Sequence, residues 1–408
     1  MKQAILLFSG IAIGAVAHVN TTFAALPLSF NAKLQARSSP GASVTAFNLP
    51  ADATIDSSAA IDANARIAFF AVMPDNSGSG APYISAIWSG TGGLGNFVYS
   101  DHAYSDSGPC MNASGAFAFT QLARFLPNFM SIYVTGTHGI DTGSVNTIQI
   151  VRPCVNTAGV IDFMADGTIY ATTDGTHVTT YATAGAGSPY ASLGPPAFND
   201  AGIMAGLVVA SANSSQHEIR AFAGDGSSNL IIANHATDAA SAYTSLDPSV
   251  SENSSGQVAV AATRTDGHRV VLRSDGITTV EIANADSSGV IRDVGTWQPT
   301  INDDGLVAFI ARDSSGEAIY VGDGIGLRRV VGEGDAMQTD LGAARLGPVN
   351  AGDPVFHSVP AINVHGDITF IADLQAGNNA ANQWGRGVFI AHALGDSIFA
   401  NGFDSAPD

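Results

Sequence analysis

The sequence predicts an all-β fold, a single β-propeller of seven four-stranded blades. One short phrase returns seven times, at steps of 43 to 61 residues, and strand-like runs separated by turns follow each copy. A repeat of about 50 residues built from short strands is typical of a propeller, in which each copy forms one blade. The copies begin at Asp62, Asn112, Asn156, Asn199, Asn253, Asn302 and Asn363.

Each copy opens with a turn. The clearest copies read Asn-Ala-Ser-Gly-Ala-Phe-Ala-Phe over 112–119 and Asn-Asp-Asp-Gly-Leu-Val-Ala-Phe over 302–309. Asn at the first position and Gly at the fourth suit a type I turn between antiparallel strands, in which Gly can adopt a positive φ. The residues expected to hold these turns are Asn112, Gly115, Asn156, Gly159, Asn199, Gly202, Asn253, Gly256, Asn302, Gly305, Asn363 and Gly366.

The rest of each copy supplies the other strands. A proline stands three residues before the Asn in five copies and marks a short, irregular strand, because proline removes a ladder donor. A second strand-like run follows the turn, as in 318–321, and an Asp-Gly hairpin such as 323–324 leads to the next strand. We expect the phenylalanines of the phrase to pack between blades; these are Phe119, Phe163, Phe309 and Phe370.

The phrase resembles that of the exported tandem-repeat proteins named for their Asn-x-x-Gly-x-x-Ala-Phe motif, whose C-terminal anchors vary between members. Its layout is also similar to TolB-type propeller blades. The resemblance covers about residues 55 to 400, with departures at Asp62, Ala65, Asp162 and Gly206. It implies a propeller and an exported protein, and the family has no established activity to carry over.

Composition limits the partners. Lys and Arg number 16 against 35 Asp and Glu, a net charge of −19, and the longest basic run is Arg328-Arg329, so nucleic-acid binding is not expected. No apolar segment after the first 24 residues is long enough to span a membrane as a helix. The even spread of copies predicts one domain over 25–404, and we expect a monomer.

The first residues predict export. Lys2, the apolar stretch 4–19 and the small residues ending at Ala24 match a signal peptide over 1–24, with cleavage after Ala24. The alternative is a buried strand or an anchor. The mature chain is therefore expected in the periplasm, on the cell surface or secreted.

The two cysteines stand at equivalent positions of neighbouring copies. Cys110 and Cys154 each lie two residues before the repeat Asn, on the strand expected nearest the axis, where neighbouring blades approach closely. An exported protein can oxidise them, so a disulfide is possible, and free thiols are the alternative.

The C-terminal residues allow two interpretations. We expect residues 397–400 to form an outer strand of the seventh blade, with a segment between Leu26 and Ser57 closing the ring, and residues 405–408 to be a flexible tail. Under this interpretation, deleting residues 396–408 should lower the melting temperature measurably. The alternative is a loose sorting or attachment tail.

No catalytic, cofactor-binding or metal residue is identified. The sequence lacks a zinc spacing, a nucleophile elbow and a phosphate loop, and His357 and His365 are interpreted as turn histidines. Acidic turns at 302–305 and 322–324 leave calcium open as a cofactor, with plain turn chemistry as the main interpretation. Trp88, Trp297 and Trp384 are interpreted mainly as packing residues that could instead line a binding face.

Three functions remain open, one of which is a structural surface protein with no specific ligand. The first is a non-enzymatic exported propeller that binds a protein or glycan on one face or in its central channel. The alternative is a secreted glycan hydrolase or lyase, which needs two carboxylates at the channel or one acid with a raised pKa. Whether the protein is an enzyme is left uncertain, and a binding protein is preferred.

Overall fold

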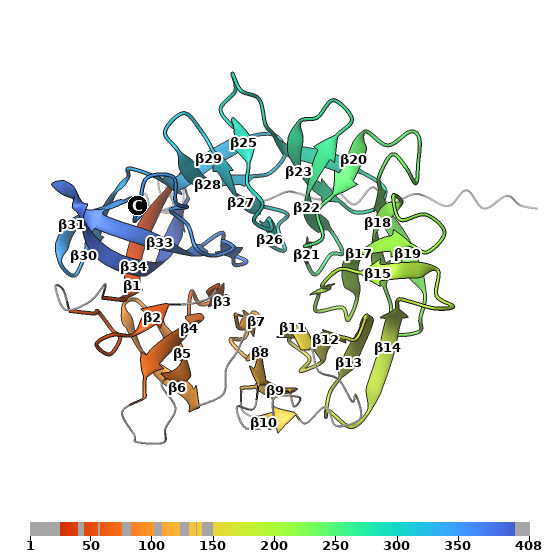
Figure 1. Ribbon diagram of the computed structural model, residues 1–408, viewed down its shortest axis with the longest axis horizontal. Coiled ribbons are helices and arrows are strands. Elements are labelled where there is room, and N and C mark those ends of the chain that lie inside the picture. The colour runs from red at the N-terminus through yellow and green to blue at the C-terminus, as the bar shows by residue number, and fades with distance from the viewer. Residues whose placement is uncertain are drawn as a thin grey trace, which may run out of the picture.

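The computed structural model describes residues 25–39, 45–55, 58–75, 83–101, 108–122, 130–135, 137–140 and 150–395. Every element in these ranges is a β-strand. The strands form seven sheets that surround a central axis as the blades of a ring (Figure 1). The predicted seven-bladed, all-β propeller is therefore confirmed. No helix of the described ranges could cross a membrane.

Consecutive antiparallel strands form the first six blades. The first contains β2 (Thr54–Ile55), β3 (Ala60–Ile61), β4 (Ile67–Pro74), β5 (Tyr83–Thr91) and β6 (Leu94–Asp101). The second contains β7 (Cys110–Met111), β8 (Phe117–Leu122), β9 (Met130–Val134) and β10 (Thr137–Ile140). The third contains β11 (Ile150–Val155), β12 (Ile161–Ala165), β13 (Thr168–Thr172) and β14 (Val178–Thr183).

The next three blades share one pattern, in which two short strands pair with the same long strand. The fourth contains β15 (Tyr190–Leu193), β16 (Ala197–Phe198), β17 (Met204–Ala210), β18 (His217–Phe222) and β19 (Ser228–Ala233). The fifth contains β20 (Tyr243–Leu246), β21 (Ser251–Glu252), β22 (Val258–Arg264), β23 (Arg269–Ser274) and β24 (Thr279–Asn284). The sixth contains β25 (Asp293–Val294), β26 (Thr300–Ile301), β27 (Val307–Arg312), β28 (Glu317–Gly322) and β29 (Leu327–Gly332).

The seventh blade closes the ring with strands from both ends of the chain. Its C-terminal strands are β30 (Ala336–Thr339), β31 (Gly342–Leu346), β32 (Ala361–Ile362), β33 (Ile368–Ala376) and β34 (Asn379–Leu394). β1 (Ser29–Arg37) pairs antiparallel with β34, with Ser29 opposite Leu394 and Arg37 opposite Gly387. β1 therefore lies within the segment expected to close the ring. β1 also occupies the position beside β34 that was expected for residues 397–400. Residues 397–400 lie outside the described residues, as do residues 1–24 and 405–408.

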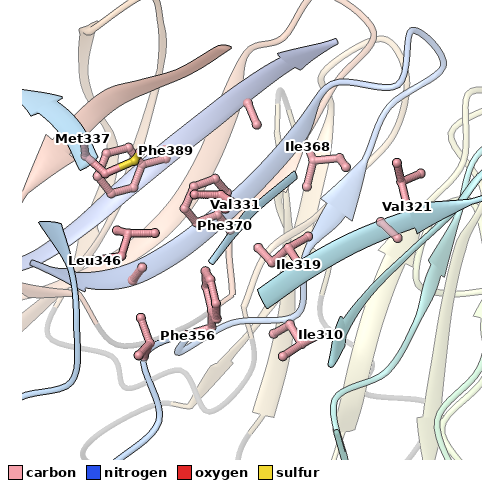
Figure 2. Packing of buried hydrophobic residues seen from close by; sticks show 14 of the residues in the cluster. Ile310, Ile319, Val321, Val331, Met337, Leu346, Phe356, Ile368, Phe370 and Phe389 are labelled. Carbon is pink, nitrogen blue, oxygen red and sulfur yellow. The ribbon is translucent and has the colours of Figure 1, made fainter. Parts of the chain in front are cut away.

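Apolar side chains fill the spaces between adjacent blades. The motif phenylalanines are at most 1% exposed, because each packs against the preceding blade. Phe119 contacts Phe70 and Tyr99 of the first blade, at ring-centre distances of 5.2 and 5.0 Å. Phe370 belongs to a cluster that joins the sixth and seventh blades, together with Ile310 and Ile319 (Figure 2). Burial of this kind holds each blade to its neighbours and to the ring.

Candidate functional site

The repeat Asn links neighbouring blades through one carboxamide. In the Asn302 turn, Oδ1 accepts the backbone N–H of Leu306 at 2.9 Å, and Nδ2 donates to the backbone oxygen of Asn363 in the next blade at 3.0 Å. The N–H of Gly305 donates to the Asn302 carbonyl at 3.0 Å, with φ of 80° at the glycine. This conformation explains the glycine preference, since other residues rarely adopt a positive φ.

Six such links follow one another around the ring. In each, Nδ2 donates to the carbonyl oxygen of the first turn residue in the next copy, and the last link, from the seventh blade, reaches Asp62 in the first. The donors, at 2.9 to 3.4 Å, are Asn112, Asn156, Asn199, Asn253, Asn302 and Asn363. All six Asn side chains are buried. Each link therefore gives a hydrogen-bond partner to a buried N–H and to a buried carbonyl that water does not reach.

The seventh junction, between the first and second blades, is made differently. Asp62 still accepts hydrogen bonds within its own turn. Its Oδ1 accepts them from the backbone N–H groups of Asn64 and Arg66 at 2.9 and 2.8 Å. A carboxylate has no donor for the next blade, and Arg66 supplies one. Its Nε bonds Asp62 Oδ2 at 3.1 Å, and its Nη2 donates to the carbonyl of Ser114 at 3.3 Å.

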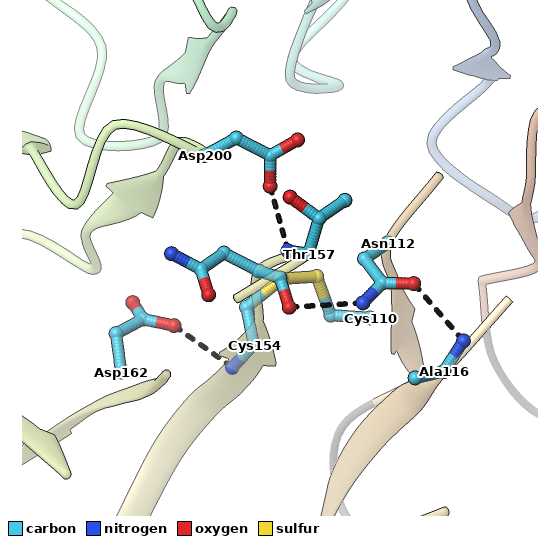
Figure 3. The surroundings of a disulfide bond; sticks show 8 residues. Cys110, Asn112, Ala116, Cys154, Thr157, Asp162 and Asp200 are labelled. Atoms are coloured by element: carbon cyan, nitrogen blue, oxygen red, sulfur yellow. Dashed lines mark hydrogen bonds between the residues drawn. A yellow bond between two sulfur atoms is a disulfide. The ribbon is translucent and has the colours of Figure 1, made fainter. Parts of the chain in front are cut away.

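A disulfide joins the second and third blades beside one of these links. Cys110 and Cys154 are bonded, with their Cα atoms 5.0 Å apart (Figure 3). The backbone N–H of Cys154 donates to Oδ1 of Asp162 at 2.9 Å. Burial raises the pKa of the Asp162 carboxyl well above its usual range, and its Oδ2 is buried without a partner among the described residues. Asp162 stands where the motif has Ala, so this departure places a polar group behind the disulfide.

The inner segments of the seven blades enclose a central pocket of about 690 Å³. Its wall includes both cysteines and apolar side chains such as Ile61 and Phe198. Its polar side chains come mainly from the third, fifth and sixth blades and from the segment before β32; the polar lining residues are Ser58, Arg152, Ser251, Glu252, Gln298, Thr300 and His357. Concave pockets of a few hundred cubic ångströms with a few polar groups are the usual small-ligand sites of proteins.

Arg152 crosses the channel from the third blade. Its Nη1 donates to Oε1 of Gln298 in the sixth blade at 2.7 Å, and Gln298 is held in turn by its Nε2, which donates to the carbonyl of Val250 at 2.6 Å. The side chain is exposed to the channel, but the surrounding walls desolvate the guanidinium and lower its pKa. Arg152 also has a φ of 46°, a strained value for a non-glycine residue, and such strain is concentrated at functional sites.

Glu252 presents an acid in the same wall. Its Oε1 accepts a hydrogen bond from Nδ2 of Asn199 at 3.1 Å, while its Oε2 is buried without a partner among the described residues. Burial raises the pKa of Glu252 to about 8, so the carboxyl is mostly protonated at neutral pH. The neighbouring Ser251 Oγ also lacks a partner among those residues. Both atoms are closed off from solvent, so they lie behind the surface of the channel wall.

The two histidines of the sequence analysis lie in different settings. His357 lines the channel, and its Nε2 bonds Oδ2 of Asp373 at 2.7 Å. Asp373 is also bonded by Nε of Arg386 at 3.3 Å. His365 is exposed in the last repeat turn, where its backbone N–H donates to Oδ1 of Asn363 at 3.0 Å. No contact brings the two rings together among the described residues.

The three tryptophans also separate. Trp88 is fully buried against Phe69, with ring centres 5.2 Å apart, and Trp384 is half-buried against the core of the last blades. Trp297 packs against that core and also lines the channel. Only Trp297 of these three therefore belongs to the candidate site.

The acidic turns use their carboxylates locally. Asp303 Oδ1 accepts the N–H of Ser254 from the neighbouring blade at 2.8 Å, and Asp323 Oδ1 accepts those of Ile325 and Gly326 at 2.7 and 2.8 Å. Across the described ranges, no group of three or more His, Cys, Asp or Glu side chains could hold a metal ion. Calcium at these turns stays a hypothesis of the sequence analysis.

Sequence reasoning missed the channel residues, although the repeat alignment contains a signal for them. One residue before the repeat Asn, six copies carry Ile, Met, Val or Phe, and the fifth carries Glu252. Four residues before the Asn stand both Arg152 and Gln298. Both positions line the channel. In most copies these two positions carry an apolar or small residue. A charged or amide residue at either position therefore indicates the site.

Comparison with solved structures finds the same fold at low sequence identity. The β-propeller domain of the Trilobed protease from Pyrococcus furiosus, described as having an open velcro topology, matches with a TM-score of 0.50 and 11% identity, over 83% of this chain and 93% of that one. Pyrococcus horikoshii acylaminoacyl peptidase gives a TM-score of 0.48 and 12% identity, over 79% of this chain and 49% of that one. Aleuria aurantia lectin gives a TM-score of 0.37 and 14% identity, over 68% of this chain and 95% of that one.

The match to the propeller domain of the Trilobed protease agrees with the propeller fold and leaves the ligand open. No family model matches the chain, and no curated protein matches it in sequence. The resemblance to the Asn-x-x-Gly-x-x-Ala-Phe family therefore stays a prediction, while the propeller it implied is present.

Proposed function

We propose that this protein is an exported, non-enzymatic propeller that binds the end of a glycan chain in its central channel. The observation that carries the proposal is the concave 690 Å³ pocket, whose wall combines apolar side chains with Arg152, Gln298 and Glu252. A few polar groups in an otherwise apolar pocket orient a small ligand, and a glycan carries hydroxyls that can bond to such groups.

The shape of the site favours a glycan over a protein surface. A stable protein interface buries about 800 Å² on each partner, usually over an open face, whereas this site is a concave pocket of small-ligand size. Trp297 adds an aromatic side chain that combines a large apolar body with a polar N–H. We therefore place the ligand in the channel and describe the partner as a glycan.

The proposed location of the protein is outside the cytoplasm. The signal-peptide pattern of residues 1–24 and the Cys110–Cys154 disulfide both fit an oxidising location, in the periplasm, on the cell surface or outside the cell. We expect a monomer whose mature chain begins at Ala25. N-terminal sequencing of exported protein tests the cleavage site, and retention of Met1 would contradict it.

A glycan and peptide panel tests the binding function. Ala361 lies in β32 and lines the channel, so Ala361→Trp should narrow the pocket and weaken glycan binding. The matched control is Asn229→Trp, an exposed position on the outer strand β19, which should leave binding unchanged. Glycan binding that is unchanged by Ala361→Trp in a folded protein would move the site out of the channel.

One observation favours the enzyme alternative, a glycan hydrolase or lyase. Glu252 is an acid with a raised pKa at the channel wall, as a general acid requires, although it is the one carboxylate among the described pocket residues. Chromatography of glycans incubated with the protein distinguishes the two functions. Unchanged glycans support binding, whereas products that disappear in Glu252→Gln support the enzyme.

A further inference from the structure

This inference rests on the proposed glycan-binding function and specifies the ligand. We propose that the glycan end held in the channel is an acidic sugar whose carboxylate binds the guanidinium of Arg152. Gln298 is the positioning residue that holds this guanidinium in place.

The first support is the charge environment of Arg152. Seven other arginines of the described ranges contact an Asp or Glu carboxylate within about 3.3 Å. Arg152 bonds the neutral amide of Gln298, and no carboxylate pairs with it among the described residues. A guanidinium held in a protein-walled channel attracts an anion, and a carboxylate matches its planar fork.

The nearby acid does not neutralise this cation. Glu252 lines the same pocket, but its raised pKa keeps it mostly protonated at pH 7. The positive charge of Arg152 therefore remains available, even though the whole chain carries a net charge of −19. A protonated Glu252 can also donate a hydrogen bond, which a carboxylate cannot.

The second support is the geometry of the guanidinium. Five N–H groups are available on an arginine side chain, and the one contact recorded among the described residues uses Nη1. Gln298 is fixed from behind by its bond to the Val250 carbonyl, so its Oε1 is oriented toward Arg152 before any ligand arrives. Such preorganisation lowers the entropy cost of binding, because the side chain is already ordered.

The surroundings favour a sugar acid over a peptide C-terminus. The pocket that Arg152 lines is also lined by Ser251 and Glu252 from the fifth blade and by Trp297 from the sixth. Polar side chains that come from the third, fifth and sixth blades (Arg152, Glu252 and Gln298) match a ligand with several hydroxyls around a ring. A peptide end would present one carboxylate, one amide and its side chains, and would leave most of these polar groups unpaired.

Calorimetry or ligand-observed NMR with small probes tests the inference at pH 7 and low salt. The probes are sodium glucuronate, the uncharged glucuronamide, glucose and the peptide Gly-Gly with free and with amidated C-terminus. Glucuronate should bind at least about tenfold more tightly than glucuronamide, because a charge-assisted bidentate contact is lost in the amide. Arg152→Gln should remove this preference and retain the affinity for glucuronamide.

Matched controls separate the inference from the proposed function. Arg292→Gln removes one positive charge at an exposed site away from the pocket and should leave the preference intact, and thermal melts verify that both variants fold. Equal affinity for the acid and the amide, or a preference that survives Arg152→Gln, overturns the inference while glycan binding stands. Binding of the free peptide acid alone overturns the sugar assignment, and no binding by any probe contradicts both proposals.

Discussion

The carboxamide of each repeat Asn bonds in two blades at once, and this explains the residue type better than turn preference alone. Oδ1 stabilises the turn of its own blade, while Nδ2 satisfies a carbonyl in the next one. Ser or Asp could form the turn, but neither offers both a strong acceptor and an N–H donor at the required distance. Asn is therefore required by the junction between blades as well as by the turn.

Replacing one of these residues should weaken a single junction. Asn302→Asp keeps the acceptor for Leu306 but loses the donor to the Asn363 carbonyl, and it buries a charge. We expect urea unfolding to show a loss of about 1–3 kcal/mol, the cost of leaving a buried group unpaired. Asp62→Asn is the matched control and should cost less, since the repeat carries Asn there in every other copy. Equal losses would contradict this role.

The pH dependence of stability should reveal the buried acid in the channel. Glu252 has a raised pKa of about 8 in the folded protein, against an ordinary value near 4.5 in the unfolded chain. Between these values the folded state binds more protons, so the stability that this group contributes is full below pH 4.5 and falls as the pH rises to about 8. The slope is at most about 1.4 kcal/mol per pH unit.

Comparison with Glu252→Gln isolates this contribution, because all other titrating groups are shared. The melting temperature of the variant relative to the natural protein should rise between pH 5 and pH 8. A difference that stays constant over this range would show that Glu252 has an ordinary pKa.

At the scale of elements, the inner strands combine structural and functional positions. Their apolar residues pack between blades, as Ile301 does, and their axial positions line the channel. The turn and strand pattern could be predicted from sequence because it is local, set by Asn, Gly and Pro within a few residues. The site could not, because Arg152 and Gln298 lie 146 residues apart in the chain and meet only once the ring is formed.

The disulfide between two inner strands should stabilise the ring. It closes a loop between cysteines 44 residues apart, which by chain entropy contributes up to about 4 kcal/mol. The double variant Cys110→Ser, Cys154→Ser should unfold at a lower denaturant concentration. In the natural protein, thiol titration after unfolding without reductant should detect no free thiol, and two free thiols would rule the bond out.

At the scale of the whole molecule, β1 and β34 join the two ends of the chain. Arg37 reinforces this closure, because its buried guanidinium bonds Asp340 at 3.0 and 2.8 Å and the Trp384 carbonyl at 2.8 Å. The closing segment was predicted within residues 26–57, but the place that β1 fills was predicted for residues 397–400. The regular repeat gives no signal for β1, which lies before the first copy of the phrase and does not share its pattern.

Opening the closure should destabilise the ring as a whole. Deleting residues 25–37 removes β1, so the melting temperature should fall by more than it does after deletion of residues 396–408. Arg37→Ala is a milder test that removes the ion pair with Asp340 and the bond to the Trp384 carbonyl, and it should lower the melting temperature by less than the deletion does. A larger effect from the C-terminal deletion would return the closing role to residues 397–400.

The chain of Asn links also bears on how such a protein can originate. Five copies donate an amide to the next blade and also accept one from the preceding blade, so the contact between them is head to tail; they begin at Asn156, Asn199, Asn253, Asn302 and Asn363. Tandem duplication of the coding segment therefore produces a new blade that already fits both neighbours. The pair of Asp62 and Arg66 departs from this rule at one junction, where a different donor completes the circle. A ring that arose by tandem duplication needs a different donor of this kind only at the junction where its first copy has diverged.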